Sequence, residues 1–486
     1  MTPAVRFLFF TLSLFVIGIF CTGKNVNSVQ NVPRSVKQYC GSCHLIPEPQ
    51  SLTKEVWQNS IFPKMSQFYI WIDSSRYEYA NLSMFEKQGT IPMNDDTWSE
   101  MLNYYESYGL DSIFVYENEV WPIQTSFIEK PIGLDKNYPI SVTAAMMTEE
   151  RILLGNAGAL VELDTNYESR ELAFLNKDIT HIYSHSGDTY LVTTSTIDPH
   201  HGPFGEVSIF DSNAENVELV LKNLERPVQM HIVDDKMLIS EFGFKNGKLS
   251  FREMTDLNKS KTIHNLPGSY RIIRAQLLEG EKEVLVTSVS QAQEGIYALL
   301  EKGDSYEVKE LIRFKPEFGL SDIDIADINQ DGLDDILVIN GDNADYSIIP
   351  KKYHGINIYL NRGNFKFSHS YSFKIHGATQ GKIIDVNEDN RPDIVASCYF
   401  AEHKEQRIVL LENQSEKELS FKPYRFTNSS MGNWMIMEKG DINSDGMDDL
   451  LLGSYNLGPK ESQDSITRLN TNILLLINQS DKQING

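Results

Sequence analysis

The sequence predicts a mainly β chain, a β-propeller of about seven blades that follows a small N-terminal all-α domain. Three acidic segments of similar sequence begin at Asp327, Asp385 and Asp441, at intervals of 58 and 56 residues. Short stretches rich in aliphatic residues lie between them. A period of this length, filled with short strands, is typical of propeller blades. Upstream, helical patterns surround two cysteines that are three residues apart.

The length and charge of the chain limit its partners. Its 486 residues are too many for one ordinary core, and 41% hydrophobic residues are enough for globular folding. The net charge of -23 excludes nucleic acid as a partner, because the phosphate backbone would be repelled. Such an acidic chain suits basic protein partners, and carboxylates also gather where calcium binds.

The first residues predict export. Arg6 precedes an apolar run over residues 7–20, which is too short to span a bilayer comfortably and is typical of a signal peptide. We expect residues 1–21 to be this signal and the protein to be periplasmic, or an outer-membrane or cell-surface lipoprotein lipidated on Cys21. Phe20 stands where a lipoprotein signal has a small residue. Cleavage nearby without lipidation, or an uncleaved anchor, therefore remains the alternative.

Residues 40–44 read Cys-Gly-Ser-Cys-His, which in an exported protein is the attachment signature of haem c. Two thiols on one helical turn, Cys40 and Cys43, can reach the two vinyl groups. His44 then lies under the porphyrin as the fifth iron ligand. A zinc site would need a second ligand pair, and a redox Cys-x-x-Cys would need a βαβ pattern; the sequence has neither.

Two methionines are candidates for the sixth iron ligand. Met93 follows Ile-Pro and directly precedes an expected helix, which carries Asp95 and Asp96 in its first turn. Met65 follows an expected helix over residues 52–61 and is the alternative axial ligand.

Residues 40–105 resemble the small bacterial class I cytochromes c. In that family an Ile-Pro-Met segment supplies the axial thioether, and a C-terminal helix packs over the N-terminal one. The resemblance implies a haem domain over residues 34–110, with Met93 as the ligand and one-electron transfer as the role.

Each acidic segment carries oxygen-bearing side chains at its positions 1, 3, 5 and 9. These are Asp327, Asn329, Asp331 and Asp335, then Asp385, Asn387, Asp389 and Asp393, then Asp441, Asn443, Asp445 and Asp449. Calcium prefers about six to eight oxygen ligands, which alternate side chains of a tight loop can supply. Gly332, Asn390 and Gly446 permit the left-handed turn that such a loop needs. Asx-rich turns without metal are the alternative.

The segments and their spacing resemble FG-GAP (VCBS-type) repeats of integrin α propellers and bacterial exported proteins. The resemblance covers residues 265–480 well and 138–265 weakly. It implies a propeller over residues 138–486, joined to the haem domain by a connector over 111–137. A fourth segment, over 275–286, retains its glycine but lacks the oxygens at positions 1 and 3, so we expect no calcium there. The whole chain resembles bacterial proteins that join a cytochrome c head to such a propeller.

Two functions follow from these expectations. In the first, the haem shuttles electrons between a redox partner protein or quinol donor and its acceptor, while the propeller docks on a protein or extracellular polymer. In the second, a substrate site in the propeller passes electrons to the haem. The sequence shows no nucleophile elbow, phosphate loop or tryptophan-rich quinone motif, which favours the first and leaves no catalytic residue to name. Cys398 is expected to be a small core residue.

Overall fold

The computed structural model describes most of the chain. The described residues are 32–42, 44–66, 69–71, 91–116, 119–134, 140–149, 151–197, 202–211, 214, 216–243, 246–291, 293–341, 349–456 and 471–479. The expected export signal, with Cys21, and the second motif cysteine, Cys43, lie outside these residues. Among the helices of the described part, none is long and apolar enough to cross a membrane.

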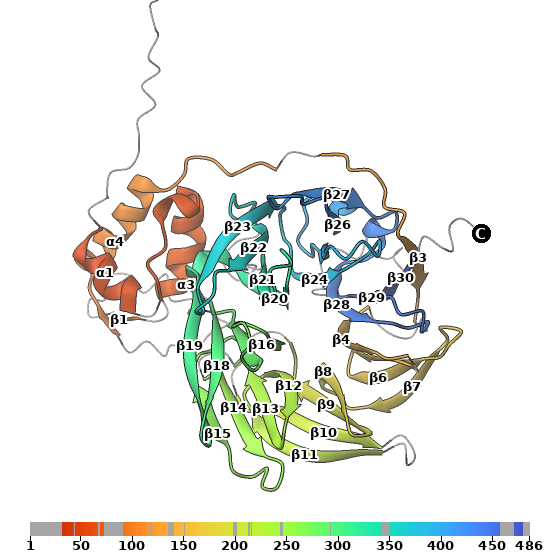
Figure 1. Cartoon of the computed structure of the whole chain (residues 1–486). Helices are drawn as coiled ribbons and strands as arrows, with labels where there is room; N and C mark the ends of the chain where they lie inside the picture. Colours follow the sequence, from red (N-terminus) through yellow and green to blue (C-terminus); the bar gives the residue numbers. More distant parts are fainter. Residues whose placement is uncertain are drawn as a thin grey trace, which may run out of the picture.

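A small helical head precedes the propeller (Figure 1). Its elements are α1 (Arg34–Tyr39), η1 (Cys40–Ser42), η2 (Pro49–Ser51), α2 (Lys54–Val56), η3 (Trp57–Ile61), α3 (Phe62–Ser66), β1 (Tyr69–Trp71), β2 (Ile91–Met93) and α4 (Asp95–Tyr108). The side chain of Asn94 caps α4 by accepting a hydrogen bond from the Thr97 amide at 2.8 Å. Helix α4 contacts α1, as the resemblance implied.

Two local expectations in the head change. The helix expected over 52–61 begins at Lys54 and continues through α2, η3 and α3 to Ser66, so Met65 lies within the helical segment rather than after it. The Ile-Pro-Met segment, in which no strand was expected, forms a short strand, β2, which pairs in parallel with β1. The strand was not visible from local sequence, because its pairing joins residues some twenty positions apart in the chain.

Seven four-stranded antiparallel sheets form the propeller, which confirms the expected blade number. The strands of each blade are given from the axis outward. Blade 1 has β4 (Val142–Met147), β5 (Ile152–Asn156), β6 (Ala159–Leu163) and β7 (Ser169–Phe174); blade 2 has β8 (Asp178–His185), β9 (Asp188–Thr194), β10 (Gly205–Asp211) and β11 (Asn216–Leu224); blade 3 has β12 (Pro227–Val233), β13 (Lys236–Glu241), β14 (Lys248–Glu253) and β15 (Lys261–His264); blade 4 has β16 (Ser269–Ala275), β17 (Val284–Val289), β18 (Gly295–Lys302) and β19 (Ser305–Arg313); blade 5 has β20 (Leu320–Ala326), β21 (Asp335–Asn340), β22 (Gly355–Asn361) and β23 (Phe367–Lys374); blade 6 has β24 (Gln380–Ile384), β25 (Asp393–Ser397), β26 (Ile408–Asn413) and β27 (Phe421–Arg425); and blade 7 has β28 (Trp434–Gly440), β29 (Asp449–Ser454), β30 (Ile473–Asn478) and β3 (Phe127–Ile132).

The ring closes with a strand from the N-terminal side of the propeller. Strand β3 pairs with β30 as the outer strand of blade 7, so part of the expected connector over 111–137 belongs to the propeller. This strand contains Pro131. An outer edge strand tolerates proline because the missing amide would face solvent rather than a partner strand. Closure in this way joins the two ends of the propeller in one sheet.

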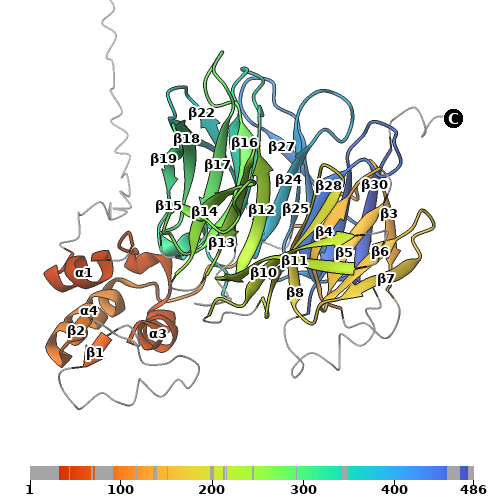
Figure 2. The same ribbon diagram turned by 90° about the horizontal axis from the view of Figure 1, so that it is seen from below.

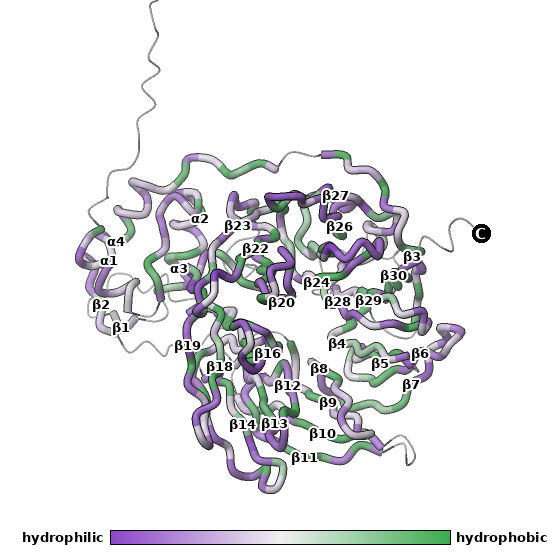
Figure 3. Tube along the Cα trace, in the orientation of Figure 1, coloured by the Kyte–Doolittle hydropathy of each residue, from purple (hydrophilic) through white to green (hydrophobic). Residues whose placement is uncertain are grey.

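The hydrophobic core of the propeller lies between neighbouring blades. Seven clusters of buried residues each combine side chains from two adjacent blades, and an eighth cluster forms the core of the head. Every residue of β21, β25 and β29 is buried, as expected for middle strands covered on both faces. Hydrophobic stretches run through the blades in Figure 3. Cys398 is fully buried in the core between blades 5 and 6, as expected.

The head and the acidic segments lie on opposite faces of the propeller. The acidic segments join the first and second strands of blades 5, 6 and 7. The head contacts Glu317 in η5 (Pro316–Phe318), which links blades 4 and 5, and Ile349, which precedes the third strand of blade 5. The links between successive blades, and those between the second and third strands of a blade, lie on one face of the propeller. The links between first and second strands, which include the acidic segments, lie on the opposite face. The edge-on view shows the head at one end of the blades (Figure 2).

Candidate functional site

The acidic segment between β20 and β21, which we call the first acidic loop, is closed by its own side chains. Asp327 accepts two backbone hydrogen bonds, at Oδ1 from Asp331 (3.0 Å) and at Oδ2 from Gly332 (2.8 Å). Asn329 Oδ1 accepts a hydrogen bond from the same Asp331 amide at 3.1 Å. Oxygens from positions 1 and 3 therefore converge on one point of the loop.

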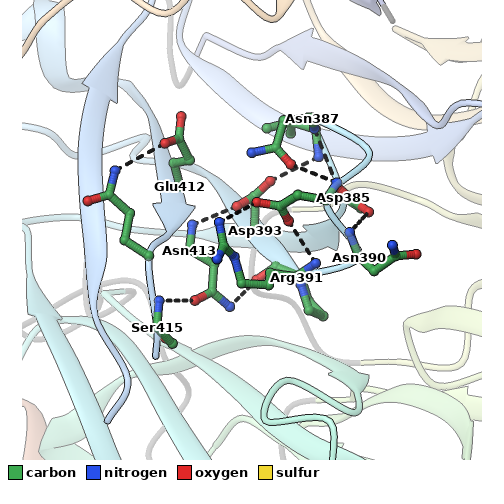
Figure 4. Close-up of polar contacts among 12 residues, drawn as sticks. Asp385, Asn387, Asn390, Arg391, Asp393, Glu412, Asn413 and Ser415 are labelled. Carbon is green, nitrogen blue, oxygen red and sulfur yellow. Dashed lines mark hydrogen bonds and ion pairs between the residues drawn. The ribbon is translucent and has the colours of Figure 1, made fainter. Parts of the chain in front are cut away.

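The second and third acidic loops, between β24 and β25 and between β28 and β29, repeat this geometry. The position-5 amide lies 3.2 Å from the position-1 oxygen and 3.1 Å from the position-3 oxygen in both. Figure 4 shows the second loop, with Asp385 and Asn387 turned toward the loop backbone. Positions 4 and 6 have positive φ in all three loops. These residues are Gln330 and Gly332, Glu388 and Asn390, and Ser444 and Gly446. The left-handed turn expected at position 6 is confirmed.

The aspartates at position 9, which are Asp335, Asp393 and Asp449, are fully buried and connect each loop to its blade. Their Oδ2 atoms accept hydrogen bonds from the position-2 amides at 3.1, 2.9 and 3.0 Å. Their Oδ1 atoms accept hydrogen bonds from the backbone amides that end the third strands. The donors are Asn361 at 2.8 Å, Asn413 at 2.6 Å and Asn478 at 2.8 Å.

These three asparagines were missed in the sequence. Each is the last residue of a strand rich in aliphatic residues, and this repeated position is a signal that could have identified them. The side chain of Asn361 donates to the carbonyl oxygens of Leu277 and Asp334, and that of Asn413 donates to Pro392. Each of the two thus holds backbone beside its acidic loop.

Burial raises the pKa of the position-9 carboxyls, to about 6 for Asp335, about 7 for Asp393 and about 6 for Asp449. Hydrogen bonds from backbone amides lower the pKa of each, and the aspartates at nearby loop positions raise it again. A bound divalent cation would stabilise the ionised form of these buried carboxyls.

The donor chemistry of each acidic loop fits calcium. Aspartate and asparagine oxygens are the hard ligands that this ion prefers. Within the described residues, no group of three or more histidine, cysteine, aspartate and glutamate side chains is already arranged to hold a metal ion. The second loop also differs from the others, because Asp389 forms an ion pair with Arg391 at 2.5 Å. Calcium at that loop would have to compete with the guanidinium.

The degenerate fourth segment, between β16 and β17, packs against the first acidic loop. The amide of Gln276 donates to Asp334 Oδ2 at 2.7 Å, and the Asp334 amide donates to the Gln276 carbonyl at 3.0 Å. Gly280 has φ +70°, so the turn persists where the oxygens at positions 1 and 3 are lost. This segment therefore supports its neighbour's loop through two hydrogen bonds between Gln276 and Asp334.

In the head, Cys40 and Met93 are buried in the same apolar core. His44 donates from Nδ1 to the Leu45 carbonyl at 2.7 Å, and this leaves Nε2 as the ring nitrogen suited to a metal. Burial lowers the pKa of His44, the Leu45 carbonyl raises it and the charge of Arg313 lowers it. Met65 is partly buried at the edge of the same core.

The segment after the cysteine motif forms the contact with the propeller. The Glu48 amide donates to Glu317 Oε1 at 3.2 Å, and the Glu48 carboxylate pairs with Lys315. Ile349 of the propeller packs against the head core. The predicted haem region thus lies beside cationic residues of the propeller, Arg313 and Lys315.

Comparison with known proteins relates the propeller to integrin α chains. Integrin alpha-8 from Gallus gallus is 22% identical over 265 residues, which is 50% of this chain and 25% of that protein. Integrin alpha-8 from Mus musculus is 22% identical over 245 residues, 46% of this chain and 23% of that protein. This chain thus spans about a quarter of the length of the curated relatives it matches.

Solved structures are more distant. The extracellular domain of a one-component system from B. thetaiotaomicron has a TM-score of 0.44 and 12% identity, over 72% of this chain and 39% of that one. The N-terminal domain of Nup159 has a TM-score of 0.43 and 9% identity, over 74% and 96%. No protein-family model matches the sequence. The weak integrin similarity and the seven blades fit the expected FG-GAP-type propeller and suggest a binding module.

Proposed function

We propose that this chain is an exported electron-transfer protein whose head carries haem c and whose propeller is a calcium-stabilised docking module. One observation carries the proposal for the head. Cys40 of the Cys-x-x-Cys-His motif and Met93 are buried in one apolar core, and the adjacent His44 has its Nδ1 hydrogen-bonded. Covalent attachment at two thiols, an oriented imidazole and a thioether are the protein groups that c-type haem uses.

Each of these residues has a distinct role in the proposal. Cys40 and Cys43 attach the group, and the hydrogen bond from His44 to Leu45 fixes the tautomer and ring orientation of the ligand. Met93, which is fully buried, is held in place by the apolar core. When bound, haem c supplies a one-electron couple whose potential is raised by methionine–histidine ligation. Met65 is the alternative thioether.

The calcium proposal rests on the acidic loops. Calcium bound by positions 1, 3, 5 and 9 would join each loop to the blade, because the position-9 aspartate already connects the loop to the third strand. Calcium would thus stabilise blades 5, 6 and 7 on the face opposite to the head. The net charge of -23 suits a basic redox partner protein, and a quinol donor is the other candidate partner for electron transfer. The propeller would dock on a protein or an extracellular polymer.

The experiment uses the full chain made with a haem-attachment system. A c-type absorption band is expected in the wild type and is expected to disappear in a Cys40→Ala, Cys43→Ala variant. The oxidised protein is then mixed with small-molecule reductants, and separately with a reduced cytochrome or a quinol.

Reduction by protein or quinol donors alone supports an electron relay. Rapid turnover with one small molecule would instead support a substrate site in the propeller, the second function considered above. Absence of any c-type band would refute the haem proposal.

A further inference from the structure

The three acidic loops share one backbone pattern but differ at position 7. That position holds Leu333 in the first loop and Met447 in the third, which carry no charge, whereas the second loop has Arg391. In every loop the position-7 amide donates to Oδ1 of the position-5 aspartate, at 3.0, 2.8 and 2.9 Å. The backbone is therefore alike in the three loops, and the difference lies in the side chains.

The second oxygen of the position-5 aspartate has a different partner in the second loop. In the first and third loops, this Oδ2 accepts a hydrogen bond from the side chain of the position-3 asparagine at 2.9 Å. Oδ2 of Asp389 instead accepts from Nη2 of Arg391 at 2.5 Å. The side chain of Arg391 thus folds back onto its own loop (Figure 4). A charged donor takes the place of a neutral amide there, and charge-assisted hydrogen bonds are the stronger kind.

The second loop also carries less negative charge. Its nine positions hold four carboxylates and one arginine, a formal charge of -3, whereas the first and third loops hold four carboxylates and no basic residue, which gives -4. Pro392 occupies position 8, where the other loops have Asp334 and Asp448, and its ring fixes φ. Asp389 is partly buried, whereas its counterparts in the other loops are exposed. A cation that enters the second loop therefore meets less negative charge and an aspartate that is already paired.

A contact from blade 5 adds to the closure of the second loop. The side chain of Gln330, at position 4 of the first loop, donates to the Asn390 carbonyl. The Asn390 amide donates to Asp385 Oδ2 at 2.8 Å. Both backbone polar groups of Asn390 are thus held by protein atoms.

We propose that the guanidinium of Arg391 is a built-in cation that closes the second acidic loop without metal, and that it makes this loop the weakest calcium site of the three. Blades 5 and 7 respond to calcium, whereas blade 6 keeps its loop ordered at low calcium. Arg391 is a positioning residue, because it holds Asp389 rather than the ion. The ranking of affinities rests on the calcium binding proposed above, but the closure by Arg391 does not.

Isothermal titration calorimetry of the full chain with calcium chloride tests the ranking. We expect two tight sites and one that is about tenfold weaker or more. A chain with Asp331→Asn and Asp445→Asn should show the weak site alone, because the first and third loops each lose a charged ligand. Adding Arg391→Leu, which gives the second loop the residue type of the first, should tighten that site about tenfold or more. Arg170→Leu is the matched control, since Arg170 pairs with Glu162 at 2.9 Å on blade 1, and it should leave the affinity unchanged.

Hydrogen–deuterium exchange in excess chelator, measured by mass spectrometry of the peptides that contain the three loops, tests closure without metal. After correction for intrinsic rates, the peptide with Asp389 and Asn390 should exchange about threefold more slowly than the corresponding peptides of the first and third loops. Arg391→Leu should remove this difference, and Arg170→Leu should retain it.

Two calorimetric results would overturn the proposal. These are three sites of equal affinity that Arg391→Leu leaves unchanged, or weaker calcium binding in Arg391→Leu, which would make the guanidinium a support for the ion. Equal exchange of the three loops in chelator would refute closure by Arg391. If no loop binds calcium, the calcium proposal fails, and the exchange experiment alone then decides the role of Arg391.

Discussion

The backbone amide of Asn413, at the end of the third strand of blade 6, donates to Asp393 Oδ1 at 2.6 Å. The other oxygen of Asp393 accepts the Val386 amide at 2.9 Å, at the start of the second acidic loop. One buried carboxylate thus connects a loop, the second strand and the third strand of the blade. The same arrangement at Asp335 and Asp449 makes this residue a structural part of each blade as well as a candidate calcium ligand.

Two substitutions in the second acidic loop should separate these roles. Asp393→Ala leaves two buried amides without acceptors, so we expect a loss of about 2–4 kcal/mol in the free energy of unfolding, even in excess chelator. Asp389→Asn removes a partly exposed ion pair with Arg391, so it should cost no more than about 1 kcal/mol in chelator and more when calcium is present. Urea denaturation with and without chelator measures both. Equal destabilisation of the two variants in chelator would contradict the assignment.

Calcium removal should lower the stability of the propeller. A site occupied at a hundred times its dissociation constant contributes about 2.7 kcal/mol, so three filled loops would raise the melting temperature clearly. Differential scanning calorimetry in calcium and in chelator measures the shift, and the visible spectrum of the head should not change. A chain with Asp331→Asn, Asp389→Asn and Asp445→Asn should melt alike in both conditions. A wild type that also does so would refute the calcium proposal.

The axial ligand of the proposed haem can be identified with a pair of methionine variants. Met93→Leu removes the thioether but retains similar volume, so the reduction potential should fall by at least about 59 mV, a tenfold change in a one-electron equilibrium. Met65→Leu should leave the potential unchanged. Redox titration of the full chain measures both. The reverse result would assign the ligand to Met65.

Closure of the ring depends on β3, and two neighbouring residues of that strand test it. Phe127 is buried against Phe426, with 6.0 Å between ring centres, whereas Ile128 is 46% exposed. We expect Phe127→Ala to cost about 3–5 kcal/mol of stability and Ile128→Ala no more than about 0.5 kcal/mol. Chemical denaturation compares them. Similar small effects would mean that β3 contributes little to closure.

The contact between head and propeller should depend on pH through Glu317. Burial raises the pKa of its carboxyl to about 7, while amide hydrogen bonds and Lys315 lower it. The folded chain therefore holds this proton more tightly than the unfolded chain. The resulting stabilisation is complete below the ordinary pKa of 4.5 and is lost as the pH rises through about 7.

Stability curves from pH 4 to 8 for the wild type and Glu317→Gln test this dependence. The difference between the two should fall across that window. Glu310→Gln, at an exposed position of the neighbouring strand, should follow the wild type. A constant difference between the wild type and Glu317→Gln would show that Glu317 does not titrate there.

Much of the propeller could be predicted because it repeats in sequence. The interval between Asp327, Asp385 and Asp441 revealed the blade length, and the glycines at position 6 indicated a turn that only residues tolerant of positive φ adopt. Strands such as β21 were recognisable as continuous aliphatic runs. These signals are local, since the spacing and backbone preference of nearby residues produce them. The calcium and haem ligands chosen from the same patterns remain predictions.

The features that were missed depend on contacts between distant parts of the chain. β3 joins blade 7 although more than 300 residues separate it from β30, and it lies in the segment that was expected to be a connector. Asn413 and its two counterparts are ordinary residues until folding brings their amides to buried aspartates. The buried ion pair between Arg271 of blade 4 and Asp322 of blade 5 arises only when successive blades place their first strands around one axis.

The sequence by itself thus determined the repeat, the acidic loops and the cysteine motif, because each is formed by residues that are close together in the chain. Only the tertiary structure decided how the ring closes, which face the head occupies and which polar groups meet at the axis. The physical reason is that burial and hydrogen bonding between blades depend on the positions of strands that are far apart in sequence. The period of the sequence repeat indicates how many strands to expect, but their spatial arrangement follows from the packing of the seven interblade cores.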